Sequence, residues 1–191
     1  MKPIILASTS PRRKQILAQS GLSFTAVSSN YEEDMTLKLK PLELAKHLSR
    51  GKATSIASKY PNHIIIGADT FIALKDELLG KPLTMEKARK SLKKISGKTV
   101  SVITGFTILD TGTKKSYSKA CETKVFIKRL SNQEIENYIK TNEPLDKAGA
   151  FAIQGLGAVI VKKIEGDYLN VMGLPLFELA RALKKFDVKI L

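Results

Sequence analysis

A run of β-branched residues in the first half of the chain sets the strongest constraint on its fold. Residues 63–68 read HIIIGA, with three consecutive isoleucines. A strand with apolar residues at successive positions presents them to both faces of a sheet, so both faces must be covered. Residues 42–58 and 85–95 carry apolar side chains at helical spacing and are candidates for that cover. The pattern predicts an α/β fold with helices flanking a sheet.

Hairpin signals interrupt the alternation of strands and helices. Phe71 to Leu79 with Lys75-Asp76 at its centre predicts one hairpin, and DTGTK at residues 110–114 predicts a turn between two further strands. Short strands are expected at residues 3–7 and 24–28, and a strand-like stretch occurs at residues 158–164. We therefore expect a mixed sheet, because hairpins add antiparallel pairs to a parallel core. The length of 191 residues permits one large domain or two lobes that share one core.

Charge and composition narrow the functional classes. The formal net charge is +14, yet the lysines and arginines are scattered, no block of five or six occurs, and tryptophan is absent. This distribution favours a solvated lysine-rich surface over a nucleic-acid face, which interleaves aromatic and basic residues. The two histidines are far apart in the sequence, so a Cys/His zinc site is not indicated. Neither histidine lies in a polar motif, so no Ser-His-Asp set is indicated.

The same composition predicts where the protein resides. A single cysteine, Cys121, excludes an internal disulfide framework and fits a reducing cytoplasm. No run of 18 apolar residues is present, and the N-terminal MKPIILASTSPRR becomes charged too early for a signal peptide. We expect a cytoplasmic protein without a membrane partner.

The segment STSPRR, residues 8–13, combines two hydroxyls with two guanidinium groups at a helix start. Ser10 is a good N-cap and Pro11 suits the first helical position. Arg12 and Arg13 place positive charge where the helix dipole favours negative charge, and a bound anion would explain this. Together with Ser8 they form a candidate phosphate site. The alternative is a capped helix with surface arginines.

Carboxylates in two segments are candidates for metal binding or proton transfer. Asp69 and Thr70 follow the buried run in GADT, and an aspartate at the carboxyl end of such a strand can hold a metal or activate water. The alternative is an aspartate that caps a turn. The pair Glu32-Glu33 could face the same site and help hold Mg²⁺, or it could be a solvated acidic loop.

Three further polar residues are less specific candidates. Lys81 lies between Gly80 and a proline in a constrained turn, and Lys52 follows the acidic loop; both could meet phosphate or only solvent. Gln154 in DKAGAFAIQGLGA has donor and acceptor atoms that suit the edge of a nucleobase, although the stretch is also a plausible glycine-rich strand entry. Neither a dinucleotide-binding fingerprint nor a P-loop is present.

Read in order, these segments resemble the Maf family of nucleoside triphosphate pyrophosphatases. The resemblance covers almost the whole chain, and the segments that carry it are ASTSPRR, the EE loop, GKA, IIIGADT, LLGKP, SGKTVSVITG, EPLDKAGAFAIQG and NVMGLPL. Within the family, STSPRR, GADT and DKAGAFAIQG are similar to the branch that hydrolyses dTTP and UTP. The sister branch, which prefers 7-methyl-GTP, is less similar there.

The resemblance implies both a fold and a reaction. The fold is α/β and akin to the inosine triphosphate pyrophosphatases: a mixed twisted sheet with flanking helices, in a single Maf-like domain over residues 1–191, with two lobes around a central cleft. The reaction is hydrolysis of dTTP and UTP, with modified pyrimidine nucleotides as further candidates, between the α and β phosphates. Water attacks with the help of a divalent metal cofactor, Mg²⁺ or Mn²⁺, and the products are the monophosphate and pyrophosphate.

The resemblance also assigns roles by position. It makes Asp69 the catalytic proton acceptor and, together with Glu33, a metal ligand. It implies substrate contacts from Ser8, Ser10, Arg12, Arg13, Lys52, Thr70, Lys81 and Gln154. The chain departs from the family pattern at Gly51, where a bulkier polar residue is more usual.

Two other functions stay open at this point. One is a 7-methyl-GTP-type pyrophosphatase of the same family, and the other is a non-catalytic regulator that binds nucleotides or nucleic acid. A homodimer is implied by the resemblance alone, as are roles in removing modified nucleotides and in cell-division arrest.

Overall fold

The computed structural model describes residues 2–75 and 77–191, so Asp76 of the predicted hairpin turn lies outside the described residues. The chain divides into two compact units. The first unit comprises Met1–Thr70, Thr104–Cys121 and Leu169–Leu191, and the second comprises Phe71–Ile103 and Glu122–Tyr168.

The first unit alternates strands and helices over its N-terminal part. Its elements are β1 (Ile4–Ala7), α1 (Pro11–Ala18), β2 (Phe24–Val27), α2 (Pro41–Thr54), the 3₁₀ turn η1 (Ala57–Lys59), α6 (Leu176–Leu183) and η5 (Lys184–Phe186). The second unit contains β4 (Glu77–Leu79), α3 (Met85–Ile95), α4 (Asn132–Lys140), the 3₁₀ turns η2 (Glu143–Asp146), η3 (Ala148–Ala150) and η4 (Gly155–Ile160), and β7 (Val161–Glu165). Four elements contribute residues to both units: β3 (Ile64–Leu74), β5 (Thr99–Asp110), β6 (Ser116–Ile127) and α5 (Tyr168–Met172).

The strands follow the order β2-β1-β3-β5-β6-β7, with β4 paired to β3. The β1–β2 and β1–β3 pairs are parallel, whereas the β3–β4 and β6–β7 pairs are antiparallel. The sheet is therefore mixed, and the α/β fold with flanking helices that the sequence predicts is confirmed.

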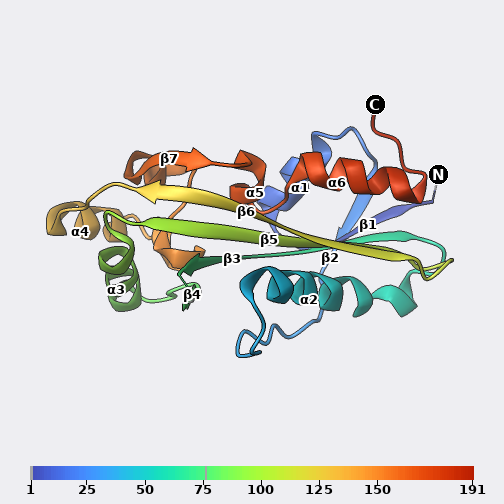
Figure 1. The fold of residues 1–191 in the computed structure, drawn as a ribbon, viewed down its shortest axis with the longest axis horizontal. Helices are drawn as coiled ribbons and strands as arrows, with labels where there is room; N and C mark the ends of the chain where they lie inside the picture. The colour runs from blue at the N-terminus through green and yellow to red at the C-terminus, as the bar shows by residue number, and fades with distance from the viewer. Residues whose placement is uncertain (1, 76) are drawn as a thin grey trace. The chain divides into compact units, whose positions relative to one another are not determined.

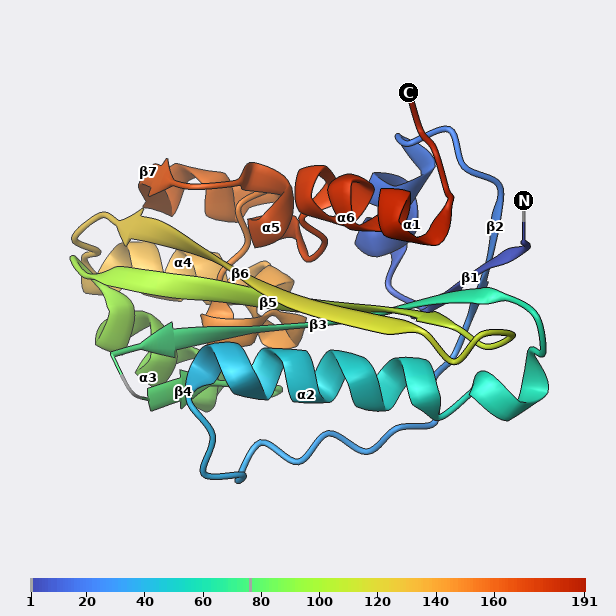
Figure 2. The same ribbon diagram turned by 45° about the vertical axis from the view of Figure 1, so that its right-hand side comes forward.

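Helices cover both faces of the strands in the first unit. Helix α2 lies on one face, and α1 and α6 lie on the opposite face (Figures 1 and 2). Ile5 of β1 and Ile65 of β3 pack with Ala53 of α2 in one apolar cluster. The isoleucine run at residues 64–66 is fully buried, as a strand covered on both faces requires.

Two glycines allow α2 to lie directly on the sheet. A Cβ atom at Gly67 of β3 would stand 2.3 Å from the carbonyl oxygen of Ser49, and one at Gly105 of β5 would stand 2.0 Å from that of Ala45. Both distances are far below van der Waals contact, so only glycine permits this close approach. The helix backbone is thereby held against two neighbouring strands.

Local capping signals are reproduced in the helices. Ser10 caps α1 and accepts a hydrogen bond from the backbone N–H of Arg13, and Pro11 is the first helical residue. The sequence Ser131-Asn132-Gln133-Glu134 predicts a capping box at the start of a helix, and both of its hydrogen bonds are present at the start of α4. No helix among residues 2–75 and 77–191 is both long and apolar enough to cross a bilayer.

Three expectations about segment boundaries are wrong. The hairpin predicted over residues 71–79 is present as the antiparallel pair of β3 and β4, but no break separates it from the strand at residues 64–68: β3 runs without interruption from Ile64 to Leu74. Residues 158–160 are not strand: they belong to η4, which begins at Gly155 with a φ of +70°. Helix α2 ends at Thr54, four residues before the end of the helix expected over residues 42–58.

The glycine contacts of α2 lead to a stability prediction. We expect Gly105→Ala to lower the free energy of unfolding by about 1–3 kcal/mol, because the new methyl group overlaps the Ala45 carbonyl and forces the helix away from β5. Urea unfolding monitored by circular dichroism measures this change. Gly80→Ala is the matched control, since a Cβ there meets nothing within 4 Å. Equal unfolding midpoints for the two variants would contradict the packing argument.

Candidate active site

The candidate residues of the first unit gather where the strand order reverses. The connection from β1 through α1 leads to β2, and the connection from β2 through α2 leads back across β1 to β3. Helices α1 and α2 cover opposite faces, so the carboxyl end of β1 is a topological switch point, the position at which α/β sheets commonly bind ligands. Ser8 follows β1 directly at this point.

Asp69 lies in the middle of a strand rather than at its end. The parallel pairing of β1 with β3 stops at Ala7–Gly67, so Asp69 and Thr70 extend past the last residue of β1. Successive side chains of a strand point to opposite faces. Asp69 shares its face with Gly67, on which α2 packs, while Thr70 points toward the face covered by α1. The strand thus sends one candidate residue to each face.

On the α2 face, Lys52 joins two carboxylates. Its Nζ atom lies 2.5 Å from Oδ1 of Asp69 and 2.6 Å from Oε1 of Glu33. The side chains of Lys52 and Asp69 are 10% and 6% exposed, whereas that of Glu33 is 44% exposed. Removing ions from water is unfavourable unless each has a partner, and here the buried aspartate and the buried lysine are paired.

On the α1 face, the guanidinium of Arg13 is held by three segments of the chain. Nε donates to the carbonyl oxygen of Gly173 at 2.9 Å, one terminal nitrogen donates to Thr70 Oγ1 at 3.0 Å, and the other donates to Ser8 Oγ at 3.4 Å. Burial lowers the pKa of Arg13, and the carboxylates of Asp69 and Glu33 act in the opposite direction. An arginine nevertheless remains charged, so a fixed cation stands beside Thr70.

The two serines of STSPRR orient the chain at the start of α1. Ser8 Oγ accepts the backbone N–H of Ser10 at 3.2 Å, and Ser10 Oγ accepts that of Arg13 at 3.5 Å. Both oxygens thus act as acceptors toward the protein, while their hydroxyl hydrogens can still donate to an anion. Arg12 and Arg13 are both partly buried, but none of the side-chain hydrogen bonds described above involves Arg12.

Thr104 is a site residue that the sequence reasoning missed. It is fully buried in β5, its hydroxyl lies 2.9 Å from that of Thr70, and it donates to the carbonyl oxygen of Asn170 at 2.9 Å. A signal was available: Thr104 falls in register with the apolar residues Val100, Val102 and Phe106. A hydroxyl on the apolar side of an alternating strand needs a buried partner.

The carboxylate set bears on the predicted metal site. Among the described residues, no three His, Cys, Asp or Glu side chains lie close enough together to form a metal centre on their own. Glu33 and Asp69 do converge, because both contact Lys52 Nζ. Two carboxylates are a suitable donor set for Mg²⁺, which commonly takes one or two carboxylates and completes its shell with water and phosphate oxygens.

Lys81 and Gln154 belong to the second unit, where both are exposed. The loop that carries Gln154 is braced by Glu143, whose carboxylate accepts the backbone N–H groups of Leu156 at 3.0 Å and Gly157 at 2.8 Å. Burial acts to raise the pKa of Glu143, but these hydrogen bonds and one from Tyr138 outweigh it and lower the pKa. The shared site predicted for Lys81, Gln154 and Asp69 stays a prediction.

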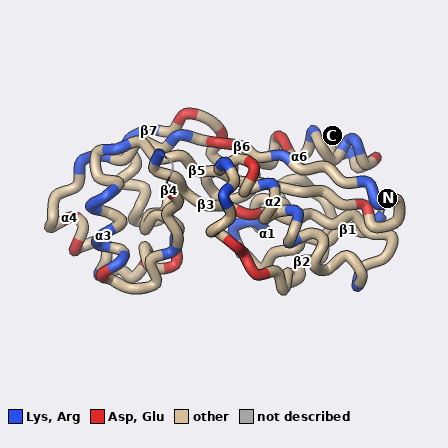
Figure 3. The backbone as a smooth tube through the Cα atoms, turned by 60° about the horizontal axis from the view of Figure 1, so that its bottom comes forward, with Lys and Arg blue, Asp and Glu red and all other residues tan. Residues whose placement is uncertain are grey.

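Several charged side chains away from the site are paired with one another. Figure 3 shows lysine and arginine distributed over the elements of both units rather than gathered on one of them. In the second unit Arg89 binds Glu136 and Lys90 binds Glu86. This arrangement agrees with the interpretation of the net charge as a solvated surface.

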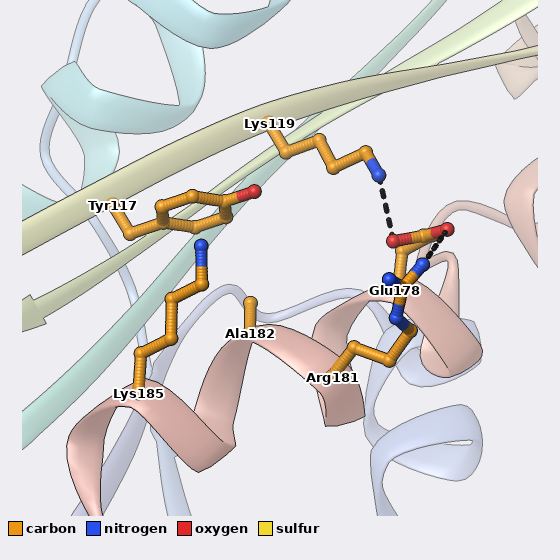
Figure 4. Close-up of a pocket in the computed structure, with 6 residues that line it drawn as sticks. All are labelled: Tyr117, Lys119, Glu178, Arg181, Ala182 and Lys185. Atoms are coloured by element: carbon orange, nitrogen blue, oxygen red, sulfur yellow. Dashed lines mark hydrogen bonds and ion pairs between the residues drawn. The ribbon is translucent and has the colours of Figure 1, made fainter.

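A separate pocket in the first unit lies between β6 and α6. Lys119 and Arg181 both contact Glu178, at 2.7 and 3.3 Å, and Lys185 Nζ stands 4.0 Å from the ring centre of Tyr117 (Figure 4). The hydrogen bond from Lys119 lowers the pKa of Glu178. No residue of the predicted active site lines this pocket.

Comparison with known proteins places the chain in a family. Residues 3–186 match the family described as Maf-like protein. The chain belongs to the Maf family. A dTTP/UTP pyrophosphatase of Methanosarcina barkeri is 48% identical over 191 residues, which cover 100% of this chain and 97% of the relative. A dTTP/UTP pyrophosphatase of Thermoanaerobacter sp. strain X514 is 49% identical over 190 residues, with 98% and 99% covered.

Likeness to solved structures is weaker. A dITP/XTP pyrophosphatase from Mycobacterium abscessus aligns with a TM-score of 0.48 and 14% identity, covering 96% of this chain and 94% of that one.

The buried pair of Lys52 and Asp69 gives a second prediction. We expect Lys52→Met to lower the free energy of unfolding by about 3–5 kcal/mol, because it leaves a buried carboxylate without its cation. Adding Asp69→Asn to that variant removes the orphaned charge and should restore part of the loss. Urea titrations of the two single variants and the double variant measure the coupling. Strictly additive losses would contradict the pairing.

Proposed function

We propose that this protein is a nucleoside triphosphate pyrophosphatase that acts on dTTP and UTP. The observation that carries the proposal is the meeting of Asp69, Lys52 and Glu33 on one face of β3, with Arg13 held on the other. A triphosphate needs fixed cations for its negative charge and a carboxylate to activate water or hold a metal. Relatives 41–49% identical, named dTTP/UTP pyrophosphatases, support this substrate class.

The proposed reaction assigns a step to each group. Water attacks the α-phosphorus, its proton passes to the Asp69 carboxylate, and the bond from the α-phosphorus to the bridging oxygen breaks as pyrophosphate leaves. Lys52 and Arg13 lower the energy of the negative charge that develops on the phosphate oxygens. Ser8 and Ser10 have hydroxyl hydrogens that can bind and orient the same oxygens.

A divalent cation is part of the proposal. Glu33 and Asp69 are the residues that would hold Mg²⁺ or Mn²⁺, and the bound ion would act as a Lewis acid on the phosphate oxygens. Lys52, already placed between these two carboxylates, offsets their repulsion in the free protein. Without a metal ion, carboxylates beside a phosphate site would repel the phosphate groups of a ligand. This argues against a regulator that binds nucleotides or nucleic acid without catalysis.

The remaining assignments are proposals of the same kind. Thr70, Lys81 and Gln154 are proposed as substrate contacts, and Gln154 suits the base because a carboxamide both donates and accepts. A cytoplasmic location and a homodimer complete the proposal; the single cysteine supports the location. A 7-methyl-GTP-type activity is the alternative within the family.

The proposed role of Asp69 is tested by Asp69→Asn. We expect this variant to release pyrophosphate from dTTP and UTP at least about 100-fold more slowly with Mg²⁺ present, because the amide cannot accept the proton. The assay should include UTP, dTTP, dCTP, GTP and 7-methyl-GTP, with the fold checked by circular dichroism. Glu86→Gln, which changes an exposed carboxylate of α3 that pairs with Lys90, is the control. Full activity in Asp69→Asn would remove that residue from the mechanism, and a preference for 7-methyl-GTP would move the enzyme to the sister activity.

Substitutions of Arg12 and Arg13 should differ in their effects on stability. We expect Arg13→Ala to lower stability by about 1–3 kcal/mol as well as activity, because it removes three hydrogen bonds at a partly buried position. Arg12→Ala should leave stability within about 0.5 kcal/mol and raise KM for dTTP. Lys14→Ala, exposed on the same helix, is the control. If Arg12→Ala lowers the free energy of unfolding more than Arg13→Ala does, the structural role given to Arg13 is wrong.

A further inference from the structure

An aromatic ring occupies the space in which residue 51 would carry a side chain. A Cβ atom built on Gly51 would stand 2.2 Å from Cζ of Tyr31 and 2.3 and 2.7 Å from its two Cε atoms. The Tyr31 ring therefore lies flush against the backbone of α2. Glycine inside a helix is unfavourable, so its presence at the eleventh position of this helix calls for a reason.

This contact lies next to the ion pair that brings Glu33 into the site. Tyr31 precedes Glu33 by two residues in the loop, and Gly51 directly precedes Lys52 on the helix. The ring meets Gly51, and two residues further along Glu33 Oε1 reaches Lys52 Nζ at 2.6 Å. The loop and the helix are thus held together at two neighbouring points.

The ion pair alone is a weak anchor for this loop. The Glu33 side chain is 44% exposed, and solvent screens the attraction of a half-exposed carboxylate. Residues 28–34 contain no helix or strand whose hydrogen bonds would fix them. A tyrosine ring supplies a large, rigid contact area at a small cost in side-chain entropy, so the ring is the stronger of the two attachments.

We propose that Tyr31 is a positioning residue. Its ring packs against the backbone of Gly51, where no side chain intervenes, and this contact holds Glu33 close to Lys52 and Asp69. The inference deepens the proposed function, on which it rests, because it explains how an exposed loop delivers a carboxylate to a buried cation. Gly51 then allows the loop to pack on α2, although glycine at this position makes the helix itself less stable.

The decisive variant is Gly51→Ala. Alanine has a higher helix propensity than glycine, but its methyl group would overlap the ring, so the Tyr31 side chain must move away from α2. We expect an unchanged or higher melting temperature together with at least tenfold faster hydrogen exchange in residues 29–34. We also expect at least fivefold weaker Mn²⁺ binding, measured by electron paramagnetic resonance, and a lower kcat for dTTP.

Three matched variants separate positioning from general packing. Arg50→Ala places an alanine at the exposed neighbouring position of α2 and should leave exchange, metal binding and kcat unchanged. Tyr31→Phe keeps the ring and should behave like the parent protein, whereas Tyr31→Ala should match Gly51→Ala. Adding Gly51→Ala to Tyr31→Ala should cause no further loss, because the displaced ring is already absent.

The outcomes distinguish failure of this inference from failure of the proposed function. Parent-like exchange in residues 29–34 of Tyr31→Ala overturns the positioning role, whatever the enzyme hydrolyses. If Gly51→Ala instead lowers the melting temperature and raises exchange throughout α2, the glycine serves packing and the inference is wrong. If the parent protein hydrolyses no nucleotide but the exchange results follow expectation, the proposed function fails while the anchoring of the loop stands.

Discussion

The ion pair of Lys52 and Asp69 is the interaction on which the arrangement of the first unit depends. Neither group is stable in a sheet interior alone, because a buried charge without a partner is destabilising by several kcal/mol. Bringing them together requires helix α2 to lie directly on β3 and β5, and this is possible because Gly67 and Gly105 have no side chains in the way. The apolar packing of the helix and the charged contact at Lys52 are therefore one structural requirement: any change that lifts α2 from the sheet also separates the pair.

Strand alternation then divides the site into two chemical halves. Asp69 faces α2 and carries the acidic half with Glu33, while its neighbour Thr70 faces α1 and meets the arginine half. Carboxylates and a guanidinium are kept on opposite sides of one strand, yet the field of both carboxylates still acts on the pKa of Arg13. A substrate at the end of β1 would thus meet cations and carboxylates from opposite faces.

Local signals in the sequence were enough for part of this structure. Ser10 and Pro11 predict the start of α1, Ser131 and Glu134 predict that of α4, and the isoleucine run predicts a strand buried on both faces; all three are confirmed. The hairpin expected over residues 71–79 is also confirmed by the pairing of β3 with β4, but its first strand is continuous with the isoleucine run, so two expected strands are one strand. Thr104 was missed because its partners, Thr70 and Asn170, lie 34 and 66 residues away in the sequence. Gly51 stood out only as an irregularity, since its reason is a ring from a loop twenty positions earlier.

The hydrogen bonds of Arg13 have a consequence for how the protein is made. Its guanidinium is held by oxygens at Ser8, Thr70 and Gly173, which leave the ribosome at the beginning, in the first half and near the end of synthesis. The cationic half of the site is therefore complete only when nearly the whole chain has emerged. In a nascent or truncated chain that lacks Gly173, the Nε–H group of Arg13 has no carbonyl acceptor there, so the set of three hydrogen bonds described above is incomplete.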